Sequence, residues 1–188
     1  MLQVAISHAG YDRLIISYKY DWRIYLHMIN IELDNAKDFM SHLFIKETFD
    51  HFLCREIELD TFVSFRIDGR LLHDFLNDIE KEELSGSPFV PWSMLKPHCF
   101  NIIKGSRTPL CIRAVFAMPP HSIASFIAKN GLHVPPDTIS GLYLNIRYEN
   151  KSLSIVTGTS LNTFTLDKSV ENAWDTAVEH FIKKTQGQ

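Results

Sequence analysis

The sequence of 188 residues predicts a single α+β domain, in which helices pack on a mainly antiparallel sheet. Three observations predict this class. Segments with strand-like alternation and segments with helix-like spacing of three to four residues are mixed along the chain. Short turns join predicted strands, as they do between antiparallel neighbours. The chain is 45% apolar and contains no repeat, linker or low-complexity tract, which is enough for one core.

The first elements of the predicted domain are a strand and a helix. Apolar and polar residues alternate over 28–33, as in a half-buried strand. Asp34 or Asn35 can cap a helix that extends to about Thr48, with its apolar residues on one face. The clearest alternation in the chain covers 57–67 and predicts a second strand.

A hairpin is expected after this second strand. Asp68-Gly69 favours a two-residue type I′ turn, so 70–75 is expected to return as a strand. Residues 77–86 are acidic and polar, which predicts an exposed loop or a short helix.

The second half of the chain is predicted to contain three helices and three strands. The expected elements are a helix at 92–104, a central strand at 110–117, a short helix at 120–129, strands at 142–148 and 153–157, and a closing helix at 168–184. Pro97 must mark a first turn or a kink of the first of these helices. Asp167 can cap the closing helix, and Lys183 and Lys184 suit its negative C-terminal end.

The first 27 residues differ in composition from the predicted domain. Five Tyr or Trp residues crowd there without a regular period, and charged residues interrupt the apolar run that a secretory signal would need. The first alternating strand starts directly afterwards. The hypothesis is therefore that Met28 is the natural start, that 28–188 form the domain, and that 1–27 are an upstream extension or a loosely attached arm.

Composition and charge exclude several classes of function. The apolar runs are shorter than the roughly 18 to 20 residues of a membrane helix, so no membrane partner is expected. Three cysteines without a CxxC pair argue against a disulfide framework and predict a cytoplasmic protein. The formal net charge of −3 provides no global basic field for nucleic acid. Residues 28–100 contain seven Lys or Arg and fourteen Asp or Glu, whereas 101–188 contain nine and six, so an anion-binding surface is expected in the C-terminal half.

Two small-polar segments that contain glycine are candidates for anion binding. Segment 157–169 leads into the closing helix, and six of its thirteen residues carry hydroxyl groups; the start of a helix can hold an anion. Gly158 lacks the second glycine and the lysine of a P-loop, so the segment matches no phosphate-binding fingerprint. The loop 104–109 adds a lysine, an arginine and a hydroxyl around Gly-Ser, which suits a phosphate or a carboxylate.

The predicted ligand-binding site combines both segments. Its residues are Lys104, Arg107, Thr108, Thr157, Thr159, Ser160 and Lys168. The site forms only if the two segments converge in the fold, and the sequence does not show the strand order. The alternative is structural: a glycine that ends a helix, a solvated basic loop, and a threonine-rich strand on a half-exposed sheet.

An acidic strand face is the candidate for a metal site. Glu56, Glu58 and Asp60 share one face of the second strand and repel one another unless a cation or basic residues lie among them. A divalent metal there would suit phosphoester hydrolysis. The alternative is a solvated face with Lys or Arg on the neighbouring strand, so no metal is assigned.

Two further patterns have both a structural and a functional interpretation. His98 and Cys99 are adjacent, so on a helix their side chains point about 100° apart and do not form a nucleophile pair. The three cysteines are therefore predicted to be core residues. Tyr143, Asn145 and Arg147 share a strand face that suits the stacking of a base and is equally an ordinary amphipathic strand.

Several segments of the chain resemble a known family. They are 46–53 (KETFDHFL), 67–70 (IDGR), 103–109 (IKGSRTP) and 157–168 (TGTSLNTFTLDK). Over 28–184 the chain resembles a family of uncharacterised bacterial proteins known only as a domain of unknown function. The resemblance implies a small, single-domain cytosolic bacterial protein, and it implies no catalytic residue because the family has no assigned activity. It leaves 1–27 outside, which supports Met28 as the start.

The sequence favours a cytoplasmic domain that binds an anionic ligand: a nucleotide, a phosphorylated metabolite or a nucleic-acid backbone. No cofactor is expected, and the sequence determines neither the oligomeric state nor whether the protein is an enzyme. One alternative is a metal-dependent phosphoester hydrolase that uses the acidic strand face. The other is a protein–protein adaptor with no small-molecule site, which would expose an apolar patch.

Overall fold

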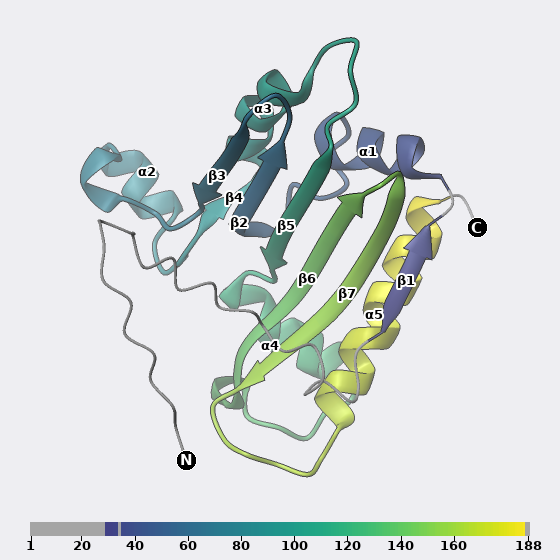
Figure 1. Cartoon of the computed structure of the whole chain (residues 1–188). Coiled ribbons are helices and arrows are strands. Elements are labelled where there is room, and N and C mark those ends of the chain that lie inside the picture. The colour runs from purple at the N-terminus through teal and green to yellow at the C-terminus, as the bar shows by residue number, and fades with distance from the viewer. Residues whose placement is uncertain (1–28, 34, 187–188) are drawn as a thin grey trace, which may run out of the picture.

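A seven-stranded antiparallel sheet organises the part of the chain that the computed structural model describes, residues 29–33 and 35–186 (Figure 1). Its strands are β1 (Asn30–Leu33), β2 (Leu53–Asp60), β3 (Ser64–Asp68), β4 (Val90–Pro91), β5 (Cys111–Ala117), β6 (Ile139–Glu149) and β7 (Ser152–Leu161). Six of them follow the order β1-β7-β6-β5-β2-β3, and β4 pairs with the first residues of β2. The predicted class, a mainly antiparallel α+β domain, is confirmed.

Four helices cover one face of this sheet (Figure 1). They are α1 (Ala36–Phe44), α3 (Trp92–Ile103), α4 (Pro120–Lys129) and α5 (Ser169–Thr185). Each contributes buried side chains to one core, where they meet the inward-facing residues of the strands. The fifth helix, α2 (Asp78–Glu83), lies beside β3 and buries none of its residues (Figure 1). Short 3₁₀ turns occur at His73–Phe75 and Pro136–Thr138.

The side chains that alternate with the core residues form a second face of the sheet, which no described helix covers. In β6, for example, Leu144 and Ile146 are buried, whereas Tyr143, Asn145 and Arg147 point to the other side. We call this surface the open face. It also carries Glu56 and Glu58 of β2, Arg66 and Asp68 of β3, Arg113 and Val115 of β5, and Ser154 and Val156 of β7.

The strand predicted at 57–67 is divided into β2 and β3. A turn at 61–63 reverses the chain, and the Thr61 N–H donates to the Val63 carbonyl at 2.9 Å. In the resulting hairpin Leu59 lies opposite Phe65, so both side chains face the core. A turn of three residues preserves the odd–even alternation from one strand to the next. The alternation of apolar and polar residues therefore keeps its phase from β2 to β3, and it does not reveal the turn between them.

The type I′ turn predicted at Asp68-Gly69 and the returning strand at 70–75 are both wrong. The Gly69 N–H donates to the Arg55 carbonyl at 3.0 Å, and the Gly69 carbonyl accepts from the Val90 N–H at 2.7 Å. The chain thus continues past the edge of β2 at Gly69, and Arg70 forms only an isolated bridge with Phe89. Because Gly69 and Arg70 continue the extended chain of β3 and pair with Arg55, Val90 and Phe89, the chain does not reverse at Asp68-Gly69.

The ends of several elements also differ from the prediction. Helix α1 ends at Phe44 rather than near Thr48, because Phe49 and Phe52 of the next segment turn into the core. Strand β7 extends to Leu161, so Thr157 to Ser160 belong to a strand and not to a loop. The helices predicted at 92–104, 120–129 and 168–184 are confirmed, each boundary agreeing to within one residue. Pro97 lies in the middle of α3 and not in its first turn.

A buried ion pair ties α3 to the segment that follows α1. The Lys96 ammonium group donates to both carboxylate oxygens of Asp50, at 2.6 and 2.7 Å, and to the Lys46 carbonyl at 2.9 Å. Nearby, the Trp92 indole N–H donates to the Leu43 carbonyl at 2.8 Å. Both of these buried donors, the Lys96 ammonium and the Trp92 indole N–H, therefore have partners.

The predicted extension at 1–27 and the proposed start at Met28 lie outside the described residues. Within 29–33 and 35–186, no helix is both long enough and apolar enough to cross a membrane.

Candidate functional site

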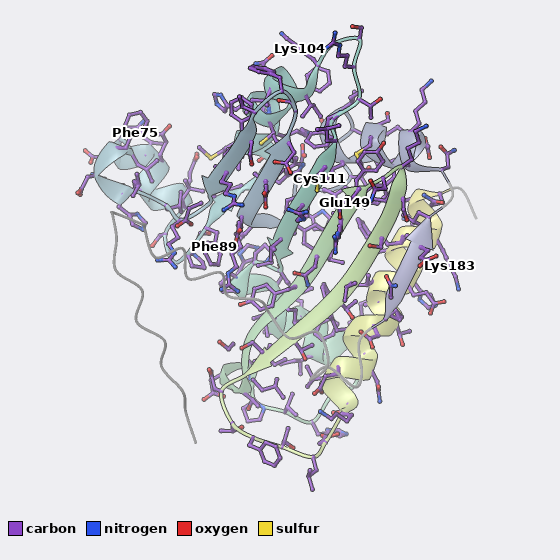
Figure 2. The ribbon with its side chains drawn as sticks, in the orientation of Figure 1. Phe75, Phe89, Lys104, Cys111, Glu149 and Lys183 are labelled. Atoms are coloured by element: carbon purple, nitrogen blue, oxygen red, sulfur yellow. The ribbon has the colours of Figure 1, made fainter. Side chains whose placement is uncertain are left out.

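The basic loop 104–109 joins α3 to β5 and lies at one end of the sheet. Figure 2 shows Lys104 in the part of this loop that extends beyond the strands. Cys111, where β5 begins, lies opposite Glu149 at the end of β6, and Glu149 lies opposite Ser152 at the start of β7. The loop therefore enters the sheet next to the β6–β7 turn.

The other predicted segment lies at the opposite end of the sheet. Thr159 and Ser160 pair with Leu142 and Gly141, at the start of β6. Seven residues of β7 separate Thr159 from Ser152, which corresponds to about 23 Å along an extended strand. The two segments therefore do not converge, and the condition for the combined site is not met. Strand β7 begins at the end of the sheet that the basic loop enters, so Thr159, near the other end of this strand, lies at the opposite end of the sheet.

The hydroxyl segment instead has structural roles. The Thr157 side chain faces the core with 1% of the residue exposed, and its hydroxyl donates to the Asp175 carboxylate of α5 at 2.5 Å. Lys168 pairs with Glu171 at 3.1 Å. Asp167 accepts from the N–H and the hydroxyl of Ser169, both at 2.9 Å, and these hydrogen bonds hold the Asp167 pKa below its ordinary value. The predicted capping of α5 by Asp167 is wrong in position: the N-cap residue is Lys168, which makes no capping side-chain hydrogen bond, and Asp167 accepts from Ser169 from one position earlier.

Replacing Thr157 with valine is expected to lower the free energy of unfolding by about 1 kcal/mol, because the hydrogen bond to Asp175 is lost while the side-chain shape is kept. Urea unfolding followed by circular dichroism measures the change. The matched control is Thr159→Val on the same face of β7, where we expect almost no effect. Equal losses in the two variants would show that the hydroxyl of Thr157 does not stabilise the fold.

A cavity of about 720 Å³ lies at the end of the sheet that the basic loop enters. We call it the sheet-end cavity. Its lining combines hydroxyl, charged and apolar groups from three connections of the sheet: 60–64, 108–111 and 148–151. Of the predicted binding residues, Thr108 lines it directly, and Arg107 and Lys104 precede Thr108 in the same loop. Phe62 and Leu110 supply exposed apolar surface at the same place.

Lys151 is a basic residue of this cavity that the sequence analysis did not select. It lies in the β6–β7 turn, where Asn150 and Lys151 have φ angles of 53° and 64°. These are the left-handed values of a type I′ turn, and Asn at the first position is a signal for such a turn. Within 29–33 and 35–186, no carboxylate lies within 4.0 Å of the side-chain nitrogens of Lys104, Arg107 or Lys151.

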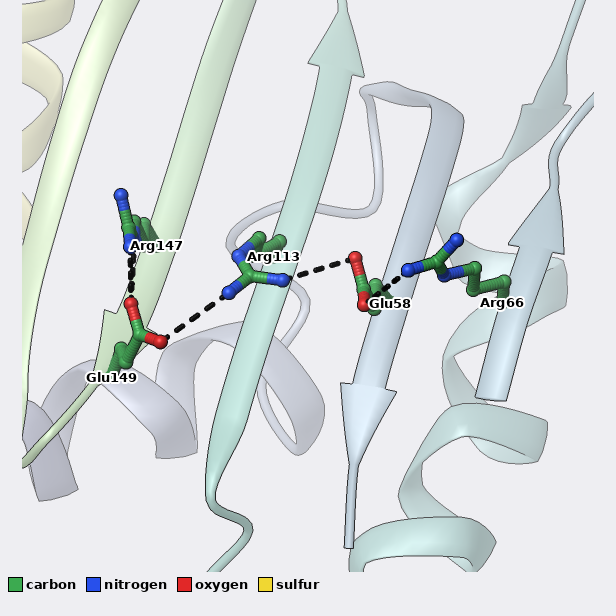
Figure 3. A network of polar contacts seen from close by, with 5 residues as sticks. All are labelled: Glu58, Arg66, Arg113, Arg147 and Glu149. Atoms are coloured by element: carbon green, nitrogen blue, oxygen red, sulfur yellow. Dashed lines mark hydrogen bonds and ion pairs between the residues drawn. The ribbon is translucent and has the colours of Figure 1, made fainter. Parts of the chain in front are cut away.

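Glu58, the central residue of the acidic strand face, is neutralised by arginines on both sides (Figure 3). Glu58 contacts Arg66 of β3 and Arg113 of β5, each at 3.2 Å. Arg113 also contacts Glu149 at 3.3 Å, and Glu149 pairs with Arg147, which holds the Glu149 pKa below its ordinary value. For Glu58, the structure therefore supports the structural alternative to a metal site, in which basic residues of the neighbouring strands balance the acidic charge. Among the described residues, no group of three His, Cys, Asp or Glu is arranged to hold a metal ion.

The three cysteines are free and buried, as predicted for core residues. Burial raises the pKa of the Cys54 thiol far above its ordinary value and that of the Cys99 thiol to about 12. Both thiols are therefore protonated at neutral pH, which does not suit a nucleophile.

The comparison with protein families decides the classification of this chain. The model described as "Family of unknown function (DUF5721)" matches residues 42–188. The chain belongs to the DUF5721 family. The resemblance to a domain of unknown function is thereby confirmed, and the match covers the sheet-end cavity and every predicted binding residue of this DUF5721 protein. No curated protein and no solved structure matches the chain.

Proposed function

We propose that this DUF5721 protein binds a phosphate-bearing ligand in the sheet-end cavity. The observation that carries the proposal is that Lys151 lines the cavity and that Lys104 and Arg107 belong to the loop that contributes Thr108 to its lining, with no carboxylate of the described residues within 4.0 Å of their side-chain nitrogens. The arginines of β3, β5 and β6, in contrast, are neutralised by Glu58 and Glu149, and Glu149 and Asp60 also line the cavity. Cationic groups that lack a partner on the protein favour an anionic ligand.

The cavity offers distinct contacts for the parts of such a ligand. The Lys151 ammonium and the Arg107 guanidinium neutralise the phosphate, and the Thr108 hydroxyl adds a hydrogen bond. Phe62 and Leu110 provide apolar surface for a ring or a sugar. A volume of about 720 Å³ suits a small molecule such as a nucleotide, which favours this ligand over a nucleic-acid backbone.

Titration with AMP, pyrophosphate and a single-stranded oligonucleotide, each at two salt concentrations, tests the proposal. We expect saturable binding that Arg107→Ala and Lys151→Ala each weaken about tenfold, the effect of losing one charge-assisted contact. Lys104→Ala is expected to have a smaller effect, because Lys104 lies farther from Thr108 in the loop. The control is Lys184→Ala, an exposed lysine in the last turn of α5.

The outcomes of this titration are distinct. Equal affinities in the wild type and in both alanine variants would exclude the sheet-end cavity as the site. If only the oligonucleotide binds tightly, and its affinity falls steeply with salt concentration, the ligand is a nucleic-acid backbone and not a small molecule.

A protein–protein adaptor is the second candidate function. It is supported by the exposure of Leu72, Phe75 and Ile79 at 76%, 90% and 70%, in the segment between β3 and β4. This function predicts no saturable binding of AMP or pyrophosphate by the wild type, so the same titration distinguishes it from the first.

A further inference from the structure

A β-bulge turns Arg55 toward the open face of the sheet. The pairing of β2 with β5 shifts register between Cys54 and Glu56, and both Arg55 and Glu56 are exposed. If side chains alternated strictly along β2, Arg55 would lie with Ile57 on the face of the sheet that the helices cover. Bulges re-aim single side chains in this way and are frequent beside binding sites.

The Arg55 guanidinium is held between two aromatic rings from opposite sides of β2. Its central carbon lies 5.3 Å from the ring centre of Tyr143 in β6 and 6.0 Å from that of Phe89, which precedes β4. Both distances are within the range of a cation–π interaction. Strand β5, which separates β2 from β6, carries only Ala117 opposite Tyr143, so the arginine can reach across it.

Two glycines make room for this arrangement. A Cβ at Gly69 would lie 1.8 Å from the Cys54 carbonyl oxygen, in the bulge itself. A Cβ at Gly141 would lie 2.3 Å from the Tyr143 hydroxyl, so the absence of a side chain leaves space for that ring. Side chains at these two positions would displace the bulge and the tyrosine.

Arg55 differs from the other arginines of this surface in having no carboxylate partner among residues 29–33 and 35–186. Arg66, Arg70, Arg113 and Arg147 all contact a carboxylate. Arg55 lines a cavity of about 380 Å³ with Phe89, Ile67, Glu56, Asp68, Arg66 and Arg70. Three guanidinium groups and two carboxylates line it, so its charge is positive by one.

We propose that Arg55 anchors a second anion-binding site, which takes the carboxylate or phosphate group of a small ligand that contains an aromatic ring. The fixed fork of guanidinium N–H donors matches two oxygens of either group. The rings of Phe89 and Tyr143 hold the guanidinium in place, and Phe89, which lines the cavity, offers surface against which the ring of the ligand packs. Six residues of β5 separate Ala117 from Cys111, about 20 Å, so this site is separate from the sheet-end cavity and independent of its function.

NMR titration of the full chain with phenyl phosphate and with benzoate tests this site. We expect saturable shifts for at least one of the two probes, and their relative affinities decide between phosphate and carboxylate. Arg55→Lys keeps the charge but loses the fork of donors, and we expect it to weaken binding about tenfold. The matched control is Arg113→Lys on the same face of the sheet. Arg113 does not line this cavity and its guanidinium is already paired with Glu58 and Glu149, so the affinity of this variant is expected to equal that of the wild type.

A second variant separates the ring contacts from the charge. Phe89→Leu is expected to weaken phenyl phosphate more than inorganic phosphate, because only the former loses the packing of its ring. Equal affinity in the wild type and Arg55→Lys overturns the proposal, and so does the absence of saturable binding of both ring-bearing probes. Loss of binding in Arg107→Ala with no change in Arg55→Lys assigns the probe to the sheet-end cavity and also overturns it.

Discussion

Replacing Gly69 with alanine is expected to lower the free energy of unfolding by about 3 kcal/mol. The added Cβ would lie 1.8 Å from the Cys54 carbonyl oxygen and 2.8 Å from its carbonyl carbon. Both atoms belong to the backbone of β2, which is paired with β5 and cannot move without breaking that pairing. Gly69 is also tied to Arg55 and Val90 by hydrogen bonds of 3.0 and 2.7 Å. Urea unfolding of the variant and the wild type measures the loss.

The control for this prediction is Gly141→Ala, where the added Cβ also makes a close contact. That contact, 2.3 Å, is with the hydroxyl end of the Tyr143 side chain, which can rotate away. We therefore expect a loss of only about 1 kcal/mol. If Gly69→Ala is no less stable than Gly141→Ala, the close packing of Gly69 against β2 is not a feature of the folded protein.

Replacing Lys96 with methionine is expected to lower the free energy of unfolding by about 3 kcal/mol. Methionine preserves the apolar stem of the lysine but leaves the Asp50 carboxylate and the Lys46 carbonyl without their donor. The expected loss is at the lower end of the range for a broken buried ion pair, because 23% of the Asp50 side chain is exposed and water screens part of its charge. Denaturant unfolding at neutral pH measures it.

A second lysine–carboxylate pair with the same separation provides the control. Lys183 and Glu179 lie 2.6 Å apart in α5, as Lys96 and Asp50 do, but both side chains are exposed. Lys183→Met is expected to cost no more than about 0.5 kcal/mol, the usual contribution of such a helix pair. Combining Lys96→Met with Asp50→Asn should recover part of the larger loss, since the uncompensated carboxylate is then removed. Equal costs at Lys96 and Lys183 would contradict the role of burial.

The two proposed sites differ in how much of them the sequence could predict. Lys104, Arg107 and Thr108 were selected because charge, glycine and a hydroxyl occur together in one short segment. Lys151 lies between the strands predicted at 142–148 and 153–157, and nothing local in the sequence places that connection beside loop 104–109. Arg55 was missed for a different reason: one extra residue in β2 moves it to the open face, and strict alternation assigns it to the core.

Thr157, Thr159 and Ser160 show the converse error. Their small polar side chains before a helix suggested an anion-binding loop, but β7 continues through them. The hydroxyl of Thr157 satisfies a buried contact with Asp175 that becomes visible only once α5 lies on the sheet. The composition of the segment before the helix therefore predicted a bound ligand, whereas the Thr157 hydroxyl binds a side chain of the protein itself.

The α+β class, the three helices of the second half and the burial of the cysteines follow from the sequence alone. These features depend on hydrophobic periodicity over a few residues, which a single chain carries in full. The tertiary structure alone decided that β2 and β3 are separate strands, that loop 104–109 meets the β6–β7 turn and not Thr159, and that Arg55 faces Tyr143 and Phe89. These features depend on strand order and register, which arise from contacts between residues far apart in the chain and leave no local periodicity.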